Sequence, residues 1–158
     1  MSNLYALQSD ADVMKYVGQG ARTQSEVMIG LEKAITHQKK YGFSLGCVFA
    51  KESGDFVGRA GLIYFAYDDT QPDIEIAYAL TKNAWNKGYA TELAKTLIDW
   101  AFQNLSITKL VAVINPDNDR SRHVLEKVKM NYVRRAHYGD NEVALYDIHK
   151  TNINDSNR

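Results

Sequence analysis

The hydrophobic positions of this chain follow two spacings, and the wider spacing predicts helices. After Thr23, apolar residues recur at intervals of three or four to about Lys40. Thr23 and Glu26 form a capping-box pattern at the start of that segment. A stronger helical stripe begins near Ala90 or Thr91 and contains Leu93, Ala94, Leu97, Ile98, Ala101 and Phe102.

The narrower spacing alternates apolar and polar residues and predicts strands. The predicted strands are Phe43–Ala50, Phe56–Tyr64, Ile74–Leu80, Lys109–Ile114, Tyr132–Tyr138 and Val143–Ile148. Shorter helices are predicted over Ser9–Val17, with Ser9 or Asp10 as its cap, and over Ser121–Lys129. Along the sequence the strands occur in groups with helices between the groups, which is typical of an α+β fold. We therefore expect a single domain with one mixed β-sheet and about four helices around it.

Length and composition are consistent with one such domain and narrow the possible partners. The chain has 158 residues, of which 45% are hydrophobic and 24% are charged, as is typical of soluble globular proteins. Lys and Arg together number 19, and so do Asp and Glu. The chain therefore lacks the surplus of basic residues that is typical of nucleic-acid-binding proteins, and we do not expect nucleic acid as a partner. We assign residues 1–150 to the domain and 151–158 to a polar tail that we expect to be disordered.

The sequence gives no indication of export, membrane insertion or metal binding. The N-terminus lacks the basic and apolar segments of a signal peptide, and no apolar run approaches the ~20 residues that span a bilayer. We therefore expect a cytoplasmic protein without membrane contact. Cys47, the sole cysteine, stands in an apolar run and is expected to be buried. The four histidines show no metal-ligand spacing, so we expect no metal site.

A glycine-containing loop separates the strand that ends at Leu80 from the strong helix. Its sequence is Trp85-Asn86-Lys87-Gly88-Tyr89-Ala90-Thr91. The first amides of a helix lack intrahelical partners and carry partial positive charge, so a helix N-terminus can bind phosphate. Gly88 lets the backbone approach an anion closely, and Lys87 adds positive charge. Taken alone, the same pattern is also that of an ordinary turn before a helix.

Two motifs at the appropriate spacing resemble the GNAT acyltransferase superfamily and, more narrowly, its RimJ/RimL-type branch. The first motif runs from Asp73 to Leu80 and continues through the glycine loop to Glu92, as in the branch's acidic strand followed by Trp-x-Lys-Gly-Tyr-Ala-Thr-Glu. The second, at residues 115–121, is similar to the branch's Asn-x-x-Ser motif. The resemblance extends from about Asp10 to Ile148 and implies an acetyl-CoA-dependent N-acetyltransferase.

The resemblance also implies where acetyl-CoA binds. It places the cofactor between the predicted strands at 74–80 and 109–114, with pantetheine along the backbone of the first strand and near Asn118. It places the pyrophosphate on the loop amides, with Arg120 or Lys87 near the phosphates. The cofactor-binding residues so implied are Ala77, Tyr78, Ala79, Leu80, Trp85, Asn86, Lys87, Gly88, Tyr89, Ala90, Thr91, Asn115, Asn118, Arg120 and Ser121.

Acetyl transfer to an amine requires a neutral amine, a donor for the developing oxyanion and a proton for the leaving thiolate. Glu75 is the candidate general base, directly or through water; alternatively it is a strand carboxylate paired with a neighbouring charge. Ser121 is the candidate proton donor; alternatively it caps the helix that it begins. An amide near Ala77 or Tyr78 is the candidate oxyanion donor.

Three positions in the second half of the chain bear on this mechanism. Many GNAT enzymes use a tyrosine on the helix after the Asn-x-x-Ser motif, where this chain has Leu125. Tyr132 and Tyr138 are later candidates, but we expect both to pack in the sheet. Lys129-Met130 replaces the branch's Gly-Phe, so a lysine is expected in the left-handed turn that ends the helix. These departures leave a second interpretation open, namely a non-catalytic CoA-binding module.

The start of the chain also departs from the family pattern. Family members usually begin with a strand, whereas this chain begins almost at its first predicted helix, and we interpret Leu4–Leu7 as a remnant of that strand. A missing edge strand would expose the backbone of its neighbour and favour a homodimer. Light scattering that finds only a monomer at high protein concentration would count against that hypothesis.

An acidic group precedes and enters the third predicted strand. It consists of Asp68, Asp69, Asp73 and Glu75, and we expect it near the acceptor. Negative charge there favours a cationic amine, either a protein N-terminus or a small-molecule amine such as a polyamine or an aminoglycoside-like compound. A solvated acidic loop is the other interpretation, and the sequence does not identify the acceptor. Binding of a nucleoside phosphate is disfavoured, because both common glycine-rich phosphate motifs are missing from the sequence.

Overall fold

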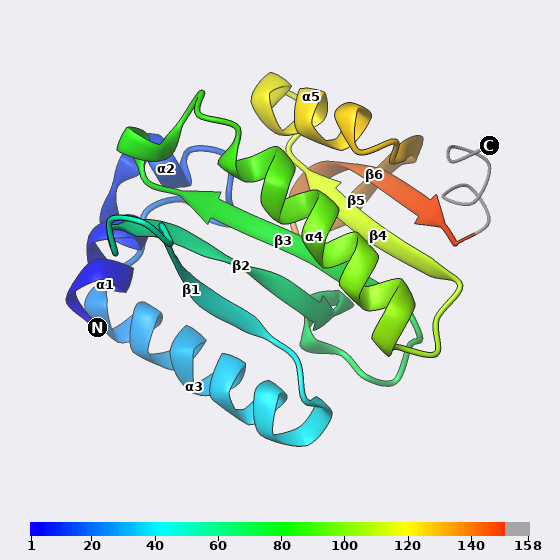
Figure 1. The fold of residues 1–158 in the computed structure, drawn as a ribbon, viewed down its shortest axis with the longest axis horizontal. Helices are drawn as coiled ribbons and strands as arrows, with labels where there is room; N and C mark the ends of the chain where they lie inside the picture. Colours follow the sequence, from blue (N-terminus) through cyan, green and yellow to red (C-terminus); the bar gives the residue numbers. More distant parts are fainter. Residues whose placement is uncertain (151–158) are drawn as a thin grey trace. The chain divides into compact units, whose positions relative to one another are not determined.

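The computed structural model describes residues 1–150, and the polar tail expected at 151–158 lies outside the described residues (Figure 1). A six-stranded mixed sheet has the strand order β1-β2-β3-β4-β6-β5. The chain divides into two compact units. The first contains Met1–Ile63 and Ala77–Ala90, and the second contains Tyr64–Ile76 and the described residues from Thr91 onward. Strand β3 (Ile74–Leu80) contributes residues to both units.

The first unit contains the N-terminal helices and one antiparallel strand pair. Its helices are α1 (Ser2–Ser9), α2 (Ala11–Met14) and α3 (Gln24–Tyr41), and its strands β1 (Leu45–Phe49) and β2 (Phe56–Tyr64) pair antiparallel. A short 3-10 helix, η2 (Lys82–Ala84), follows β3. The capping box predicted at Thr23 is present, and α3 ends at Tyr41, one residue beyond the predicted end near Lys40. Met14 and Val27, which are fully buried, and Leu62 lie in the core of this unit.

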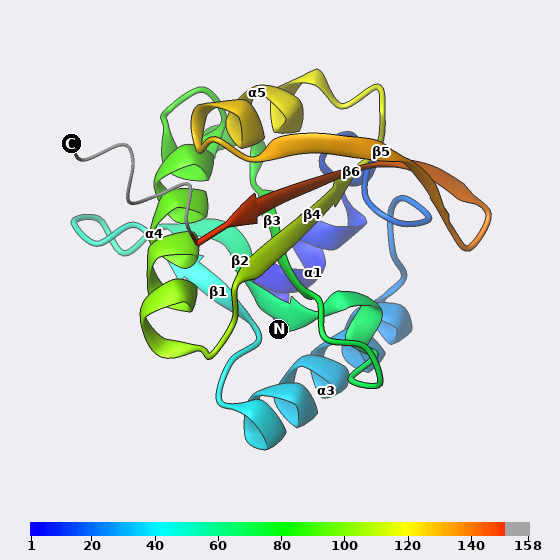
Figure 2. The same cartoon turned by 90° about the vertical axis from the view of Figure 1, so that its right-hand side faces the viewer.

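The second unit contains the long helix and the late strands. Its elements are η1 (Phe65–Tyr67), most of α4 (Tyr89–Asn104), β4 (Lys109–Ile114), α5 (Asp119–Lys127), β5 (Asn131–Tyr138) and β6 (Asn141–His149). β3 runs parallel to β4, with Glu75 opposite Val111, and β6 pairs antiparallel with β4. Figure 2 shows β5 and β6 as a long curved hairpin. The stripe predicted on α4 is buried at Ala94, Ile98, Ala101 and Phe102.

Three local expectations are wrong. Leu4–Leu7 is part of helix α1, because Leu4 and Leu7 lie one helical turn apart and both are buried on the same face. Cys47 is exposed because β1 stands at one end of the strand order. Tyr132 and Tyr138 are 56% and 44% exposed because β5 stands at the other end of the strand order.

The homodimer expected from an exposed sheet edge stays a prediction. No helix within residues 1–150 is long and apolar enough to cross a membrane.

The lysine expected in a left-handed turn is found there. Lys129 has a φ of 63°, a conformation that glycine adopts without steric cost. Its amide donates to the carbonyl of Glu126, and the next amide, that of Met130, donates to the carbonyl of Leu125. These two hydrogen bonds close the end of α5 and lead into Met130, which is 3% exposed. The chain therefore retains the family's turn with a residue that strains it.

Replacing Lys129 by Gly is expected to stabilise the protein. A non-glycine residue in the left-handed region costs about 1 kcal/mol, and Lys129→Gly removes that cost. Urea unfolding should therefore show a higher midpoint at an unchanged slope. The matched control is Lys127→Gly in the last turn of α5, which should destabilise by about 1 kcal/mol. A lower midpoint for Lys129→Gly would show that contacts of the lysine side chain outweigh the backbone strain.

Candidate active site

The glycine loop joins β3 to α4 and exposes its central residues. Trp85 Nε1 donates to the carbonyl of Leu80 at 3.0 Å, so the indole ties the loop back to the end of the strand. Asn86 and Gly88 both have left-handed backbones, with φ of 59° and 84°, and α4 begins at Tyr89. Asn86, Lys87 and Gly88 are exposed. The loop thus presents a lysine and the amides of a helix N-terminus to solvent, an arrangement that binds anions.

An ion-pair cluster in the first unit anchors the residues just before this loop. Lys82 Nζ lies 2.9 Å from Asp12 Oδ2 and 3.1 Å from Asp10 Oδ2. Asp10 also caps α2 through hydrogen bonds from the amides of Asp12 and Val13. Its hydrogen bond with Lys82 lowers the pKa of the Asp10 carboxyl, and the two aspartates raise the pKa of Lys82. The N-terminal helices are therefore linked to the segment that leads into the glycine loop.

The Asn-x-x-Ser motif forms the turn into α5. Asn118 Oδ1 accepts a hydrogen bond from the amide of Ser121 at 3.2 Å, and Asn115 Oδ1 accepts one from the amide of Asp117 at 2.9 Å. Asn118 is therefore the N-cap, and the interpretation of Ser121 as the cap is wrong because the helix begins two residues earlier, at Asp119. Ser121 is half-buried and Arg120 is exposed. Leu125 is 1% exposed and belongs to the core.

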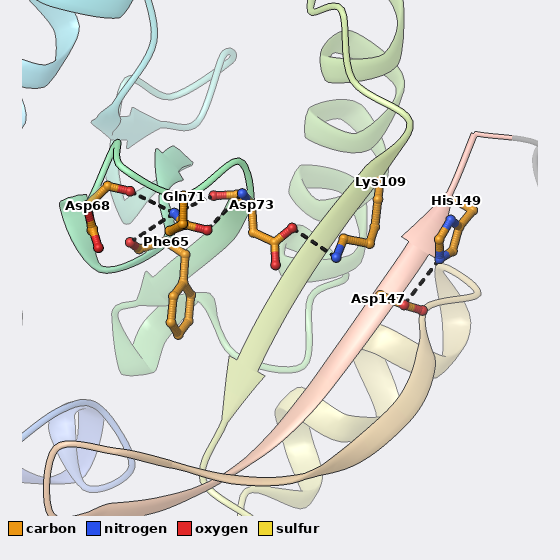
Figure 3. A network of polar contacts seen from close by, with 7 residues as sticks. All are labelled: Phe65, Asp68, Gln71, Asp73, Lys109, Asp147 and His149. Atoms are coloured by element: carbon orange, nitrogen blue, oxygen red, sulfur yellow. Dashed lines mark hydrogen bonds and ion pairs between the residues drawn. The ribbon is translucent and has the colours of Figure 1, made fainter.

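The carboxylates of the acidic group have different surroundings. Asp73 pairs with Lys109 on β4, with Oδ1 and Nζ 2.9 Å apart (Figure 3). Asp68 Oδ1 accepts hydrogen bonds from the amide and the hydroxyl of Thr70, and these bonds lower the pKa of its carboxyl. Glu75 is half-buried on β3. These three carboxylates therefore differ in their partners and burial, and a role of the acidic group in binding the acceptor stays a prediction.

The loop between β2 and β3 is held by the side chain of Gln71. Its Nε2 donates to the carbonyls of Asp68 and Asp73 at 2.7 and 3.1 Å, and its Oε1 accepts from the amide of Asp73 at 2.8 Å (Figure 3). The loop also contains two consecutive left-handed residues, Ala66 and Tyr67, although neither is glycine. Backbone strain of this kind persists only where surrounding contacts hold it, and Gln71 supplies them.

An aromatic contact joins this loop to the hairpin of β5 and β6. The rings of Phe65 and Tyr138 meet edge to face, with centroids 5.4 Å apart. Burial, and then the negative charge of Glu75, raise the pKa of the Tyr138 phenol. The phenol therefore stays protonated at neutral pH and can donate a hydrogen bond. Sequence analysis missed Phe65 and Gln71, and it assigned Tyr138 to the packing of the sheet.

The structure brings some of the predicted site residues together, in one group in each unit. In the first unit, the end of β3, Trp85 and the start of α4 form one continuous loop region. In the second unit, Asn115, Asn118 and Ser121 share one turn, while Glu75 lies on β3 near Tyr138. The cofactor and catalytic roles of these residues stay predictions. Within residues 1–150, no three His, Cys, Asp or Glu side chains are grouped to hold a metal ion.

Comparison with known proteins identifies the family. The family model of the acetyltransferase (GNAT) domain matches residues 1–131. The chain is 30% identical over 139 residues to the uncharacterized protein YkkB of Bacillus subtilis, an alignment that covers 88% of this chain and 80% of YkkB. It is 26% identical over 128 residues to the uncharacterized N-acetyltransferase YnaD of Bacillus subtilis, with coverage of 80% and 71%. The chain therefore belongs to the GNAT acetyltransferase family.

Solved structures show the same fold at low sequence identity. An aminoglycoside acetyltransferase in complex with coenzyme A and kanamycin superposes with a TM-score of 0.80 at 14% identity, covering 99% of this chain and 93% of that one. The spermidine N-acetyltransferase of Vibrio cholerae, in complex with CoA and spermine, superposes with a TM-score of 0.74 at 15% identity, covering 93% and 88%. Both neighbours bind CoA together with an amine-bearing compound.

Proposed function

We propose that this protein is an acetyl-CoA-dependent N-acetyltransferase of the RimJ/RimL-type branch, and that residues 1–150 act as one catalytic domain. The observation that carries the proposal is the exposed loop Asn86–Gly88 at the N-terminus of α4, which follows the strand that holds Glu75. Family membership and the CoA complexes of structural neighbours support it. The acceptor is a primary amine on a small molecule or a protein N-terminus, and we expect the reaction to take place in the cytoplasm.

The residues present are suited to holding the cofactor. Amides of Asn86–Thr91 would bind the pyrophosphate, with Lys87 or Arg120 near the phosphates. A Cβ at Gly88 would meet no atom within 4 Å, so the space above the loop is open to a ligand. The end of β3 and Asn118 would contact pantetheine, as in the family pattern. When bound, acetyl-CoA supplies the acetyl group as a thioester, whose C–S bond breaks as the amine nitrogen forms the new C–N bond.

Residues of the chain would accept the proton that the amine loses and donate the proton that the thiolate gains. Glu75, directly or through water, would accept the proton that the amine nitrogen must lose. Ser121 would donate a proton to the departing thiolate of CoA, while Asn118 caps the helix by accepting from the Ser121 amide. An amide near Ala77 or Tyr78 would donate to the developing oxyanion. Leu125 cannot supply a proton, so a mechanism with a helical tyrosine is excluded at that position.

The test is release of CoA thiol from acetyl-CoA across a panel of primary amines, together with thermal unfolding in the presence of CoA. An enzyme should show both CoA-dependent stabilisation and amine-dependent thiol release. Stabilisation by CoA without transfer to any amine would favour the alternative, a non-catalytic CoA-binding module. If CoA produced neither effect, both assignments would be wrong.

A further inference from the structure

Lys82, at the start of η2, lies between two carboxylates of the N-terminal segment. Its Nζ is 3.1 Å from Asp10 Oδ2 and 2.9 Å from Asp12 Oδ2, and we call these three side chains the ionic cluster. All three residues belong to the first unit, as do residues 85–90 of the glycine loop. The ionic cluster therefore joins α2 to the backbone that leads into the loop.

The α2 side of the ionic cluster is fixed independently of Lys82. Asp10 Oδ1 accepts hydrogen bonds from the amides of Asp12 and Val13 at 2.9 and 3.4 Å, which leaves Oδ2 to face the lysine. The carbonyl of Asp10 accepts from the amide of Met14, and the Met14 side chain is fully buried. Because α2 is capped and anchored in the core, it provides a firm support for Lys82.

The loop side is connected to Lys82 through the backbone. The carbonyl of Lys82 accepts from the amide of Trp85 at 3.1 Å, and the amide of Ala84 donates to the carbonyl of Thr81 at 2.9 Å. Ala84 is 5% exposed, so η2 is packed against the rest of its unit. Asn86 follows Trp85 directly and begins the exposed part of the loop. A displacement of Lys82 would therefore reach the loop through one hydrogen bond and one peptide bond.

The loop itself needs support of this kind. Asn86 has a left-handed backbone with a φ of 59°, and a residue other than glycine keeps that conformation only where its surroundings hold it. Backbone amides also bind an anion best when their directions are fixed before the anion arrives. Beyond Gly88, helix α4 fixes the backbone. Before Asn86, the backbone is held by the ionic cluster and by the indole of Trp85, which donates to the carbonyl of Leu80.

The charge of the ionic cluster does not favour an anion. The hydrogen bond with Lys82 lowers the pKa of the Asp10 carboxyl, and the hydrogen bonds with Asp12 and Asp10 raise the pKa of Lys82, so the lysine and Asp10 stay charged at neutral pH. Two carboxylates and one ammonium give the cluster a formal charge of −1. Because that charge repels a pyrophosphate, a favourable effect on CoA binding would have to come from the position of the loop.

We propose that Lys82 is a positioning residue, which holds the glycine loop in the conformation that binds the pyrophosphate of CoA and acts through its ion pairs with Asp10 and Asp12. This inference rests on the proposed function, because it concerns the cofactor of the same reaction. It gives α2 a part in cofactor binding, although the motifs that point to CoA in the sequence lie far from that helix.

The experiment measures the Kd of CoA by calorimetric titration and the KM for acetyl-CoA, on the full chain at a temperature where every variant is folded. Lys82→Met should weaken CoA binding only about fivefold, because exposed ion pairs contribute little individually. The KM for acetyl-CoA should rise by the same factor, while kcat changes less than about twofold. Lys82→Arg should bind CoA within about twofold of the unmodified protein, because a guanidinium can pair with both carboxylates.

Asp12→Asn distinguishes the position of the loop from the charge of the cluster. It removes one ion pair together with one negative charge, and the cap of α2 by Asp10 remains. Positioning predicts that CoA binds about threefold more weakly, whereas a purely electrostatic role predicts equal or tighter binding. The matched control is Glu142→Gln, which removes one carboxylate from another exposed ion pair, that with Arg135 in the second unit. We expect it to leave the CoA affinity unchanged.

A second measurement reports on the segment before the loop without any cofactor. The amides of Ala84 and Trp85 donate the hydrogen bonds that form η2. Their hydrogen exchange should be at least about threefold faster in Lys82→Met and in Asp12→Asn than in the unmodified protein, because loss of the ion pairs makes local opening easier. Exchange at the same amides in Glu142→Gln should match that of the unmodified protein.

The possible outcomes separate this inference from the activity on which it rests. Unchanged CoA affinity in Lys82→Met, equal or tighter binding in Asp12→Asn, or an equal loss in Glu142→Gln would overturn the inference and leave the activity standing. Weaker CoA binding with unchanged hydrogen exchange would also overturn it, because Lys82 would then act on the phosphates directly. If both variants of the ionic cluster behaved as expected but no amine were acetylated, the positioning role would stand and the catalytic assignment would fail. If the unmodified protein did not bind CoA, both would be wrong.

Discussion

Replacing Glu75 by Gln is expected to lower kcat about a hundredfold while leaving the affinity for CoA unchanged. A positioned general base contributes roughly 10²- to 10⁴-fold to a rate, and the amide of glutamine keeps the size of the side chain but accepts no proton. The residue is half-buried on β3, opposite Val111 of β4, so the isosteric change should preserve the strand pairing. Steady-state transfer from acetyl-CoA, with CoA binding measured separately, gives both quantities.

The control for Glu75→Gln is Asp73→Asn, two residues earlier in the chain. Asp73 is paired with Lys109, so its replacement removes a nearby charge without removing the proposed base. We expect its kcat to change less than threefold, because a partly exposed ion pair contributes little. Equal losses in the two variants would mean that local negative charge, and not proton transfer, explains the effect. An unchanged kcat for Glu75→Gln would remove Glu75 from the mechanism.

Replacing Gly88 by Val is expected to weaken CoA binding at least tenfold and to abolish stabilisation by CoA. Gly88 has a φ of 84°, which a β-branched residue adopts only with strain of about 1–3 kcal/mol. The added side chain would also extend into the open space above the loop, where we place the pyrophosphate. The backbone strain and the added side chain would both weaken binding of the pyrophosphate. Thermal unfolding with and without CoA measures the loss.

Gly54 provides a control with matched geometry. It lies in the turn between β1 and β2 with a φ of 74°, and a Cβ there would also meet no atom within 4 Å. Gly54→Val should therefore lower the thermal stability by a similar amount, while its affinity for CoA stays that of the unmodified protein. If both variants lost CoA binding equally, the effect at Gly88 would be general destabilisation and the loop would not be the phosphate site.

Local sequence patterns were sufficient to predict much of the fold. The bounds predicted for β2, β3 and β4 match the structure, because alternation along a strand is a property of neighbouring residues. The left-handed turn at Lys129 was also predictable from one position in a family motif. Cys47 and Tyr138 were misjudged, because exposure at a sheet edge depends on which strands are missing beside it. A pattern of neighbouring residues in the sequence does not show which strands lie beside a given strand.

The candidate site, like the fold, was predictable only where it depends on residues that are contiguous in the sequence. The glycine loop is contiguous in sequence, so its motif could be recognised directly. The pairing of Phe65 with Tyr138 joins residues far apart in the chain, and neither has a neighbour that indicates the other. The left-handed backbone at Ala66 and Tyr67 was unpredictable for a related reason, since such conformations are normally recognised by glycine or asparagine. The part of the site that was missed is therefore the part that depends on tertiary contacts.

The ion pairs of Lys82 have a practical consequence for anyone who handles this protein. They link α2 to the segment that leads into the glycine loop, and Lys82 and Asp12 are 70 positions apart in the chain. Removal of the first dozen residues would therefore take away both carboxylates that pair with Lys82, in the segment ahead of Gly88. Activities of preparations that differ in their first twelve residues should therefore be compared only after their stability has been measured.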